Sequence, residues 1–110
     1  MIQRGDIVTV TAPGAYDKPR PAVVIQGDAL NQADSRSTIV ALMTSTIVEA
    51  PLLRLTVRPA PGNGLKKVSQ VQANRILTLP TEKTGHRIGQ LSESEITALN
   101  RMLAIVIGLG

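Results

Sequence analysis

Arg20, which stands between two prolines, is the residue of this chain whose type and setting point most directly to chemistry. It belongs to the run Lys18-Pro19-Arg20-Pro21, directly before the apolar residues 22–25. Each proline fixes its own φ and pushes the preceding residue toward extended geometry, so the backbone at Arg20 is restricted on both sides. A guanidinium keeps its charge and presents a planar fork of donors that matches phosphate. Arg20 is therefore a candidate phosphate-binding residue; the alternative is an ordinary surface cation flanked by prolines.

Other reactive residue types are scarce. The chain has no cysteine, one histidine, His86, and one aromatic residue, Tyr16. Without cysteine there is no disulfide, thiolate metal site or cysteine nucleophile. A single histidine excludes a two-histidine ribonuclease mechanism within one chain. A single aromatic ring cannot form the base-stacking platform of RRM or OB domains, so nucleic acid would be bound through phosphates and base edges.

Length and charge restrict the class of protein further. The 110 residues predict one domain, residues 1–110. The net charge of +4 and the pI near 10.1 favour a polyanionic partner, chiefly nucleic acid, or an acidic protein. We see no signal peptide and no apolar run long enough to cross a bilayer. We therefore expect a cytoplasmic protein that does not contact a membrane.

Short stretches of strand composition, separated by glycine and proline, would position these residues. β-branched or alternating side chains predict strands over residues 5–12, 22–26, 38–43, 52–58 and 67–72, an extension of uncertain type over 75–79, and a final strand over 85–91. One helical turn is expected at 29–31. Within 52–58, alternation predicts that Leu53, Leu55 and Val57 are buried. The same alternation gives Arg54, Thr56 and Arg58 a basic, solvated face.

The last segment has the signals of a helix. Ser92 and Glu95 have the spacing of a capping box, and Gly108 is placed to end the helix. Apolar residues recur at helical spacing between them, namely Ile96, Leu99, Met102, Leu103, Ile105 and Val106. This stripe is typical of core packing. Several strands followed by one amphipathic helix predict a mainly β, α+β protein: a small, strongly twisted antiparallel barrel capped by the helix.

Five stretches in this order resemble the MazF/PemK family, the ribonuclease toxins of bacterial toxin–antitoxin pairs. They are Arg4-Gly5-Asp6-Ile7-Val8, the run from Lys18 to Ile25, Leu42-Met43-Thr44-Ser45, Ser69-Gln70-Val71, and Ile88-Gly89-Gln90-Leu91-Ser92. The resemblance implies an SH3-like barrel that dimerises and cleaves single-stranded RNA at short sequences. It also implies that neither a metal nor another cofactor is needed, and that a short acidic antitoxin neutralises the protein.

The resemblance also suggests site residues. Arg20 matches the arginine of the family's Arg-Pro motif, and Thr44 matches its threonine at the end of the third strand; these two are the expected catalytic residues. In metal-free cleavage the 2′-OH attacks the neighbouring phosphorus, so Arg20 would neutralise the phosphoryl charge and Thr44 would orient the 2′-OH or a phosphate oxygen. The residues expected to contact RNA are Lys18, Ser45, Arg54, Lys67, Ser69 and Gln70.

The chain departs from the family in ways that leave the general base unassigned. Some members carry His or Glu before the Arg-Pro motif, where this chain offers only Tyr16 and Asp17. Others place an arginine and an acid on the fifth strand, where this chain has Gln70 and Gln72. Lys18, Lys67 or water remain candidates for the base. For Ser69 and Gln70, an ordinary polar strand face is the alternative to substrate contact.

Two other functions remain open at the level of sequence. A CcdB-like toxin on the same barrel binds DNA gyrase and has no need of Arg20 and Thr44. A plain SH3-like module for RNA or protein would require only the basic face with Arg54 and Arg58. The aliphatic content of the last helix, residues 99–109, favours packing against a second copy.

Overall fold

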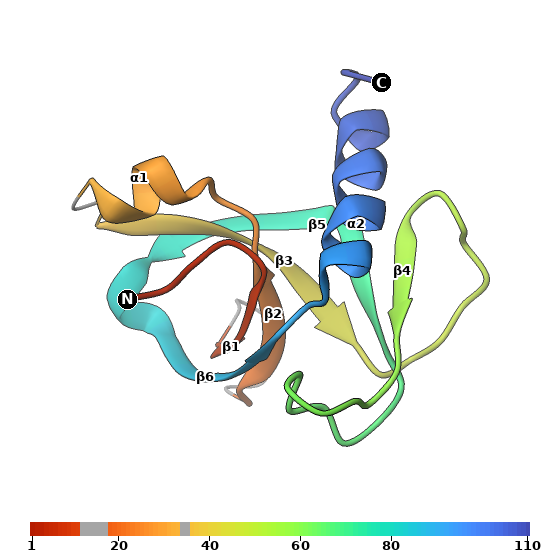
Figure 1. Cartoon of the computed structure of the whole chain (residues 1–110), viewed down its shortest axis with the longest axis horizontal. Helices are drawn as coiled ribbons and strands as arrows, with labels where there is room; N and C mark the ends of the chain where they lie inside the picture. The colour runs from red at the N-terminus through yellow and green to blue at the C-terminus, as the bar shows by residue number, and fades with distance from the viewer. Residues whose placement is uncertain (12–17, 34–35) are drawn as a thin grey trace.

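The computed structural model describes residues 1–11, 18–33 and 36–110. Tyr16 and Asp17, the two candidates for proton transfer before Arg20, lie outside the described residues. In chain order the elements are β1 (Asp6–Val10), β2 (Arg20–Val24), α1 (Asp28–Gln32), β3 (Ser37–Thr44), β4 (Arg54–Val57), β5 (Ser69–Pro80), the 3-10 turn η1 (Thr81–Lys83), β6 (Thr84–Gln90) and α2 (Glu93–Val106) (Figure 1). The predicted strands, helical turn and final helix are all present, with shifted ends.

The strands form one antiparallel sheet. Over the described residues the strand order is β4-β5-β3-β2-β1-β6. This confirms a mainly β fold with a C-terminal helix. The strands at the two ends of the order, β4 and β6, do not pair with each other within the described chain, so the sheet is open rather than a closed barrel.

The long strand β5 differs most from the sequence prediction. Residues 67–72 and 75–79 were expected as two pieces, whereas Ser69–Pro80 is one strand. Its pairing with β3 changes register between Ala41↔Ile76 and Met43↔Val71, so several residues of β5 lie opposite Leu42. Extra residues of this kind bend a strand. The gap between the two expected pieces is therefore a bulge within one strand.

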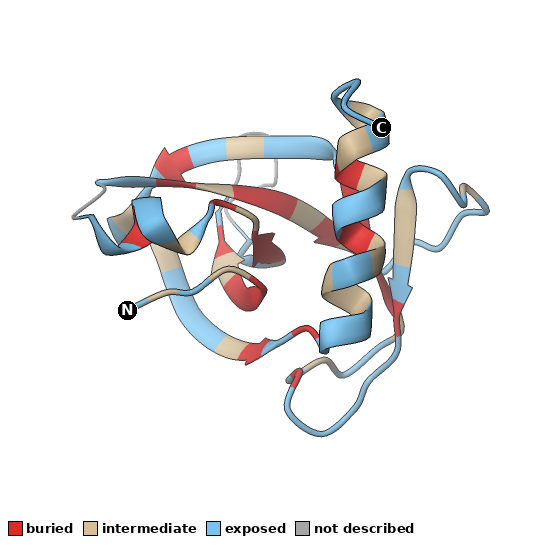
Figure 2. Cartoon of the chain, turned by 45° about the horizontal axis from the view of Figure 1, so that its top comes forward, coloured by how far each residue is buried: buried red, intermediate tan, exposed pale blue. Residues whose placement is uncertain are grey.

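Two apolar clusters occupy opposite faces of the sheet, because alternate residues of each strand point to opposite sides. One contains Ile7, Val23 and Met43 and is covered by Leu99 and Leu103 of α2. The other contains Val8, Ala22 and Val40, with Leu79 from the far half of β5. In Figure 2 the buried residues of α2 lie on the side that faces the sheet.

The helix α2 begins and ends as its sequence predicts. The Ser92 hydroxyl accepts a hydrogen bond from the Glu95 N–H (3.2 Å), and the Glu95 carboxylate accepts one from the Ser92 N–H (2.8 Å). At the other end Gly108 has φ +82°, and the Leu109 N–H donates to the Ala104 carbonyl, as in a Schellman motif. One residue of the expected core stripe is misplaced: Ile105 is 49% exposed because it lies on the outer side of the helix.

The segment before β4 also differs from expectation. The strand covers Arg54–Val57 alone, because the Leu53 and Arg54 N–H groups both donate to the Ala50 carbonyl and form a turn. Leu53, expected on the buried face, is 39% exposed. Val57 is fully buried as expected, and Leu55 packs against the core under α2.

Candidate functional site

One end of the sheet gathers most of the residues expected to act together. Strand β3 runs antiparallel to both β2 and β5, so its last residue lies beside the first residues of those two strands. Arg20 opens β2, Thr44 closes β3, and Ser69 and Gln70 open β5. Figure 1 shows the end of β3 next to the start of β5. Residues far apart in the chain thus meet at this end because of strand pairing.

The register places four polar side chains in one row. The β2–β3 pairs run from Val24↔Val40 to Ala22↔Leu42 and end there. If the same register is extended by two residues, Arg20 comes level with Thr44. Thr44 pairs with Gln70, and Gln70 pairs with Thr56. Directly opposed residues of an antiparallel pair point to the same face. The row Arg20–Thr44–Gln70–Thr56 therefore crosses β2, β3, β5 and β4 on the face opposite α2.

Arg20 is exposed, and its side chain makes no hydrogen bond or ion pair with any described residue. It is the first residue of β2 and pairs with Val10, so it is part of the strand rather than of the preceding loop. A strand residue with an exposed guanidinium combines a fixed backbone with free donors. This is the arrangement that a phosphate-binding arginine needs.

Thr44 is half-buried, and its hydroxyl oxygen accepts a hydrogen bond from the Thr46 N–H (3.1 Å). A hydroxyl has one donor as well as its acceptor sites. Because the N–H of Thr46 occupies an acceptor site, the Thr44 O–H remains available to donate. The geometry supports a donor role toward a phosphate oxygen.

The cations around this row differ in how they are held. Lys18 precedes β2 and Lys67 precedes β5, and both are exposed. Arg54 is half-buried: its Nη1 donates to the Thr46 carbonyl (3.1 Å) and to the Gln70 side-chain oxygen (3.1 Å). Arg54, expected on a solvated face, is thus fixed against the loop that follows Thr44.

The remaining expected contacts are of two kinds. Ser45 is exposed directly after β3, whereas Ser69 is buried and its hydroxyl donates to the Lys67 carbonyl (3.0 Å). Gln70 is 3% exposed, with both amide atoms bonded within the chain. Thr56 was not among the expected site residues, although its alternation with Arg54 on β4 already placed it on the same face.

Arg4, Gly5 and Asp6 have a structural role in the described chain. The buried Asp6 carboxylate accepts from the Gln3 N–H (2.8 Å) and from Arg87 Nε (3.0 Å). Arg4 Nε donates to the Ile25 carbonyl (2.9 Å), and its N–H donates to the Asp28 carboxylate (2.7 Å). These bonds tie the start of the chain to β6, to the end of β2 and to α1.

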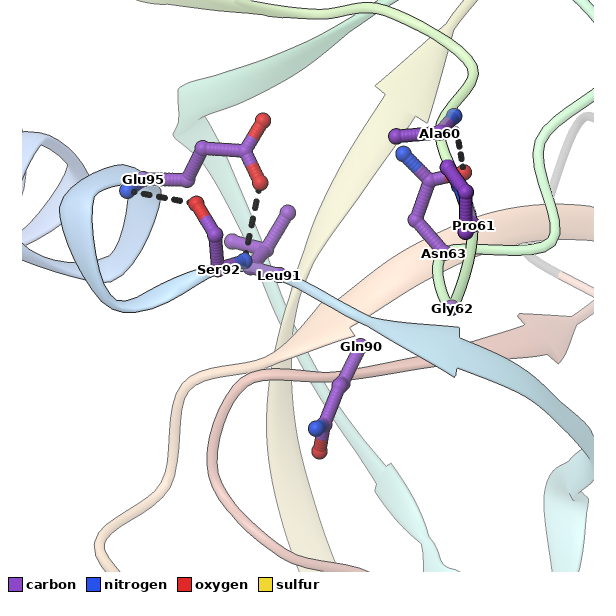
Figure 3. Close-up of a pocket in the computed structure, with 8 residues that line it drawn as sticks. All are labelled: Ala60, Pro61, Gly62, Asn63, Gln90, Leu91, Ser92 and Glu95. Atoms are coloured by element: carbon purple, nitrogen blue, oxygen red, sulfur yellow. Dashed lines mark hydrogen bonds between the residues drawn. The ribbon is translucent and has the colours of Figure 1, made fainter.

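A hollow of about 170 Å³ lies between the turn at 60–63 and the start of α2 (Figure 3). The side chains of Asn63, Ser92 and Glu95 that line it are already bonded within the chain. Asn63 accepts from the Ala60 N–H (3.2 Å) and donates to the Arg58 carbonyl (2.8 Å), while Ser92 and Glu95 form the capping box. This hollow therefore belongs to the packing of the turn against the helix.

Two further findings concern metal binding and membrane-spanning helices. In the part of the chain that the structure describes, no group of three or more His, Cys, Asp or Glu side chains could hold a metal ion. Among the same residues, no helix has the length and apolar character needed to span a membrane.

An open antiparallel sheet with an exposed arginine at the start of β2 and a threonine hydroxyl at the end of β3 has the groups that contact phosphates in proteins that bind nucleic acid. Comparison with known proteins also points to a protein that acts on RNA. Residues 3–107 match the family described as PemK-like, MazF-like toxin of type II toxin–antitoxin system. The chain is 38% identical over 109 residues to a probable endoribonuclease MazF of Mycolicibacterium smegmatis, covering 98% of each chain. The chain therefore belongs to the PemK/MazF toxin family.

Solved structures show the same fold. An endoribonuclease in complex with its cognate antitoxin from a mycobacterial species has a TM-score of 0.82 at 22% identity, covering 100% of this chain and 98% of that one. The Mycobacterium tuberculosis toxin MazF-mt6 has a TM-score of 0.80 at 24% identity, covering 96% and 98%. A MazE–MazF structure from Deinococcus radiodurans has a TM-score of 0.76 at 20% identity, covering 99% and 97%.

Proposed function

We propose that this protein is the toxin of a type II toxin–antitoxin pair and acts as an endoribonuclease that cuts single-stranded RNA without a metal. Membership of the family and 38% identity to a probable endoribonuclease support the activity. The observation that carries the proposal is the antiparallel pairing of β2 with β3, which brings the start of β2, at Arg20, to the end of β3, at Thr44. The relatives reported above are ribonuclease or MazF toxins, so the comparisons do not favour the gyrase-binding alternative or the plain binding module.

The reaction follows from the groups in the row. The 2′-oxygen forms a bond to phosphorus, the P–O5′ bond breaks, and the products are a 2′,3′-cyclic phosphate and a 5′-OH. Arg20 neutralises the charge that develops on the phosphoryl oxygens, and the Thr44 O–H donates to one of them. The 2′-OH proton passes to a base, for which Lys18, Lys67, water, Tyr16 and Asp17 remain candidates. The 5′-oxygen gains a proton from an acid or from water.

The same assignment gives the remaining expected residues their roles. Lys18 and Lys67 flank the row and would bind RNA phosphates, while the exposed Ser45 would contact the strand next to Thr44. Ser69 would contact RNA only as an acceptor, because its O–H already donates to Lys67. We propose a cytoplasmic location for the protein, because the single-stranded RNA that it would cleave is found there.

Cleavage of a long single-stranded RNA in excess EDTA tests the activity. We expect wild type to give discrete cuts that end in 2′,3′-cyclic phosphate. The Arg20→Ala and Thr44→Ala variants should each lose about 100-fold in rate, because each removes a donor to the phosphoryl group. His86→Ala, which changes an exposed residue of β6, is the matched control and should cut like wild type. An intact RNA with wild type, or full activity in Arg20→Ala, would contradict the proposal.

An acidic antitoxin and a second copy are the protein partners that we propose. The structural relatives include a toxin in complex with its cognate antitoxin, and this chain carries a net charge of +4. Apolar residues are exposed at the C-terminal end of α2 and beside it, including Ile107 (58%), Leu109 (78%) and Leu52 (62%). They border two apolar hollows of about 460 and 530 Å³ on this part of the surface.

The exposed apolar residues predict a homodimer in solution. We expect sedimentation at micromolar concentration to give twice the mass of one chain. Ile107→Glu should shift the protein toward the monomer, because it places a charge on the apolar surface. Glu93→Lys, on the first turn of the same helix, should leave the mass unchanged. A wild-type protein that sediments as a monomer would rule out this prediction.

A further inference from the structure

The side-chain amide of Gln70 is buried beneath the loop that follows Thr44, residues 45–53, here termed the β3–β4 loop. Its oxygen accepts from the Val48 N–H (3.2 Å) and from Arg54 Nη1 (3.1 Å). Its nitrogen donates to the Val48 carbonyl (2.9 Å) and to the Thr56 hydroxyl (3.2 Å). An amide has two acceptor sites and two donors, so all four are used. Gln70 therefore has no hydrogen-bonding capacity left for RNA. This differs from the sequence analysis, in which Gln70 was expected to contact RNA.

The bonds to Val48 hold the middle of the β3–β4 loop. Residues 45–49 are exposed and belong to no strand, yet both backbone groups of Val48 bond to one buried side chain. Gln70 thus pairs with the loop in the way that a neighbouring strand would. Because Thr44 pairs with Gln70 across the sheet, the residue that holds the loop also lies beside the catalytic threonine.

The bond to Arg54 fixes a second cation near the row. Arg54 uses Nη1 alone, for the Gln70 oxygen and the Thr46 carbonyl, both within the part of the chain described. Its Nε and Nη2 donors make no hydrogen bond to the described residues. A guanidinium held by one nitrogen keeps an oriented set of donors, which is the geometry for binding an oxyanion such as phosphate.

We propose that Gln70 is a positioning residue that holds the β3–β4 loop and Arg54 beside Thr44, so that Arg54 binds an RNA phosphate neighbouring the one that is cut. This proposal rests on the proposed function. It gives Gln70 an effect on RNA affinity that acts through Arg54 and the loop.

The test uses Gln70→Leu, with Gln72→Leu as its matched control. Gln72 is also buried, lies two residues along the same strand, and donates to the Leu42 carbonyl rather than to the loop. Hydrogen exchange should show the Val48 amide exchanging at least about tenfold faster in Gln70→Leu, with exchange in α2 unchanged. In Gln72→Leu the Val48 amide should exchange as in wild type.

The functional readout is the affinity for a single-stranded RNA with 2′-O-methyl groups, which block attack by the 2′-oxygen. Gln70→Leu and Arg54→Ala should each raise Kd about tenfold, and the double variant should raise it little further, because both changes remove the same phosphate contact. Gln72→Leu should stay within about twofold of wild type. Equal losses in the two Leu variants, unchanged exchange at Val48, or fully additive effects of Gln70→Leu and Arg54→Ala would overturn the proposal.

The outcome for Gln70 is separable from the outcome for the activity. If wild type binds the blocked RNA but leaves unmodified RNA intact, the proposed cleavage fails while the affinity series still decides the role of Gln70. If wild type cuts RNA and Gln70→Leu binds as wild type does, the activity stands and the positioning role fails.

Discussion

The buried carboxylate of Asp6 is stabilised by its hydrogen-bond partners. Asp6 is 2% exposed and accepts hydrogen bonds from Gln3 and from Arg87, whose side chain is half-exposed. A buried charge is tolerated only when it is paired and hydrogen-bonded. The Arg-Gly-Asp run of the sequence thus ties the start of the chain to β6.

The residue-scale prediction concerns this carboxylate. Asp6→Ala should lower the free energy of unfolding by about 1–3 kcal/mol, because it leaves the Gln3 N–H and a bonded arginine without their acceptor. Urea unfolding followed by circular dichroism measures the change. Glu82→Ala, at an exposed position of η1, is the control and should unfold at the wild-type urea concentration. Equal stability of Asp6→Ala and wild type would show that the pair contributes nothing.

At the scale of elements, the turn at 58–65 depends on its contact with β6. Asn63 is 4% exposed and bonds to Ala60, Leu65 and Arg58, and the Gly62 carbonyl accepts from the Gln90 N–H (2.9 Å). Gly64 has φ +69°, and a Cβ there would overlap the Ile88 carbonyl. Gly62 has φ +90° but open space around it.

These two glycines give the element-scale prediction. Gly64→Ala should destabilise the protein more than Gly62→Ala, because the first adds a clash with β6 to the backbone strain that both share. The difference should appear in thermal unfolding as a lower Tm for Gly64→Ala. If the two variants melt together, the packing of the turn against β6 does not limit stability.

At the scale of the whole molecule, charge governs the encounter with RNA. The net charge of +4 includes exposed Lys18, Arg20 and Lys67 at one end of the sheet. A phosphate contact releases counterions from the nucleic acid, so affinity falls with salt in proportion to the number of contacts.

The salt dependence of binding is the molecule-scale prediction. The slope of log K against log salt for a 2′-O-methyl RNA should become less steep by about 0.7 in Arg20→Ala, which corresponds to one phosphate contact on a single strand. Lys83→Ala, an exposed cation of η1 that is not at the site, should leave the slope nearly unchanged. A slope that is the same in Arg20→Ala and wild type would mean that Arg20 does not contact phosphate.

The sequence by itself determined most of the elements and supplied the residues of the candidate site. Local patterns were sufficient for the capping box of α2, for its end at Gly108 and for most strands, because these depend on residues close together in the chain. The Arg-Pro motif and Thr44 could likewise be recognised from short stretches. Leu53 and Ile105 were misplaced, because a turn and the outer side of the helix overrode simple alternation and spacing.

Tertiary structure decided which of these residues lie close together. Two features come from pairing between distant strands: the bulge that joins the two halves of β5, and the register that sets Thr44, Gln70 and Thr56 in one row. The pairing of β2 with β3 likewise brings Arg20 to this end of the sheet. A pattern within one strand gives the face of a residue but not its neighbour on the next strand. For the same reason the sequence left Gln70 as either a polar strand residue or an RNA contact, whereas the structure buries it and gives it four hydrogen bonds within the chain.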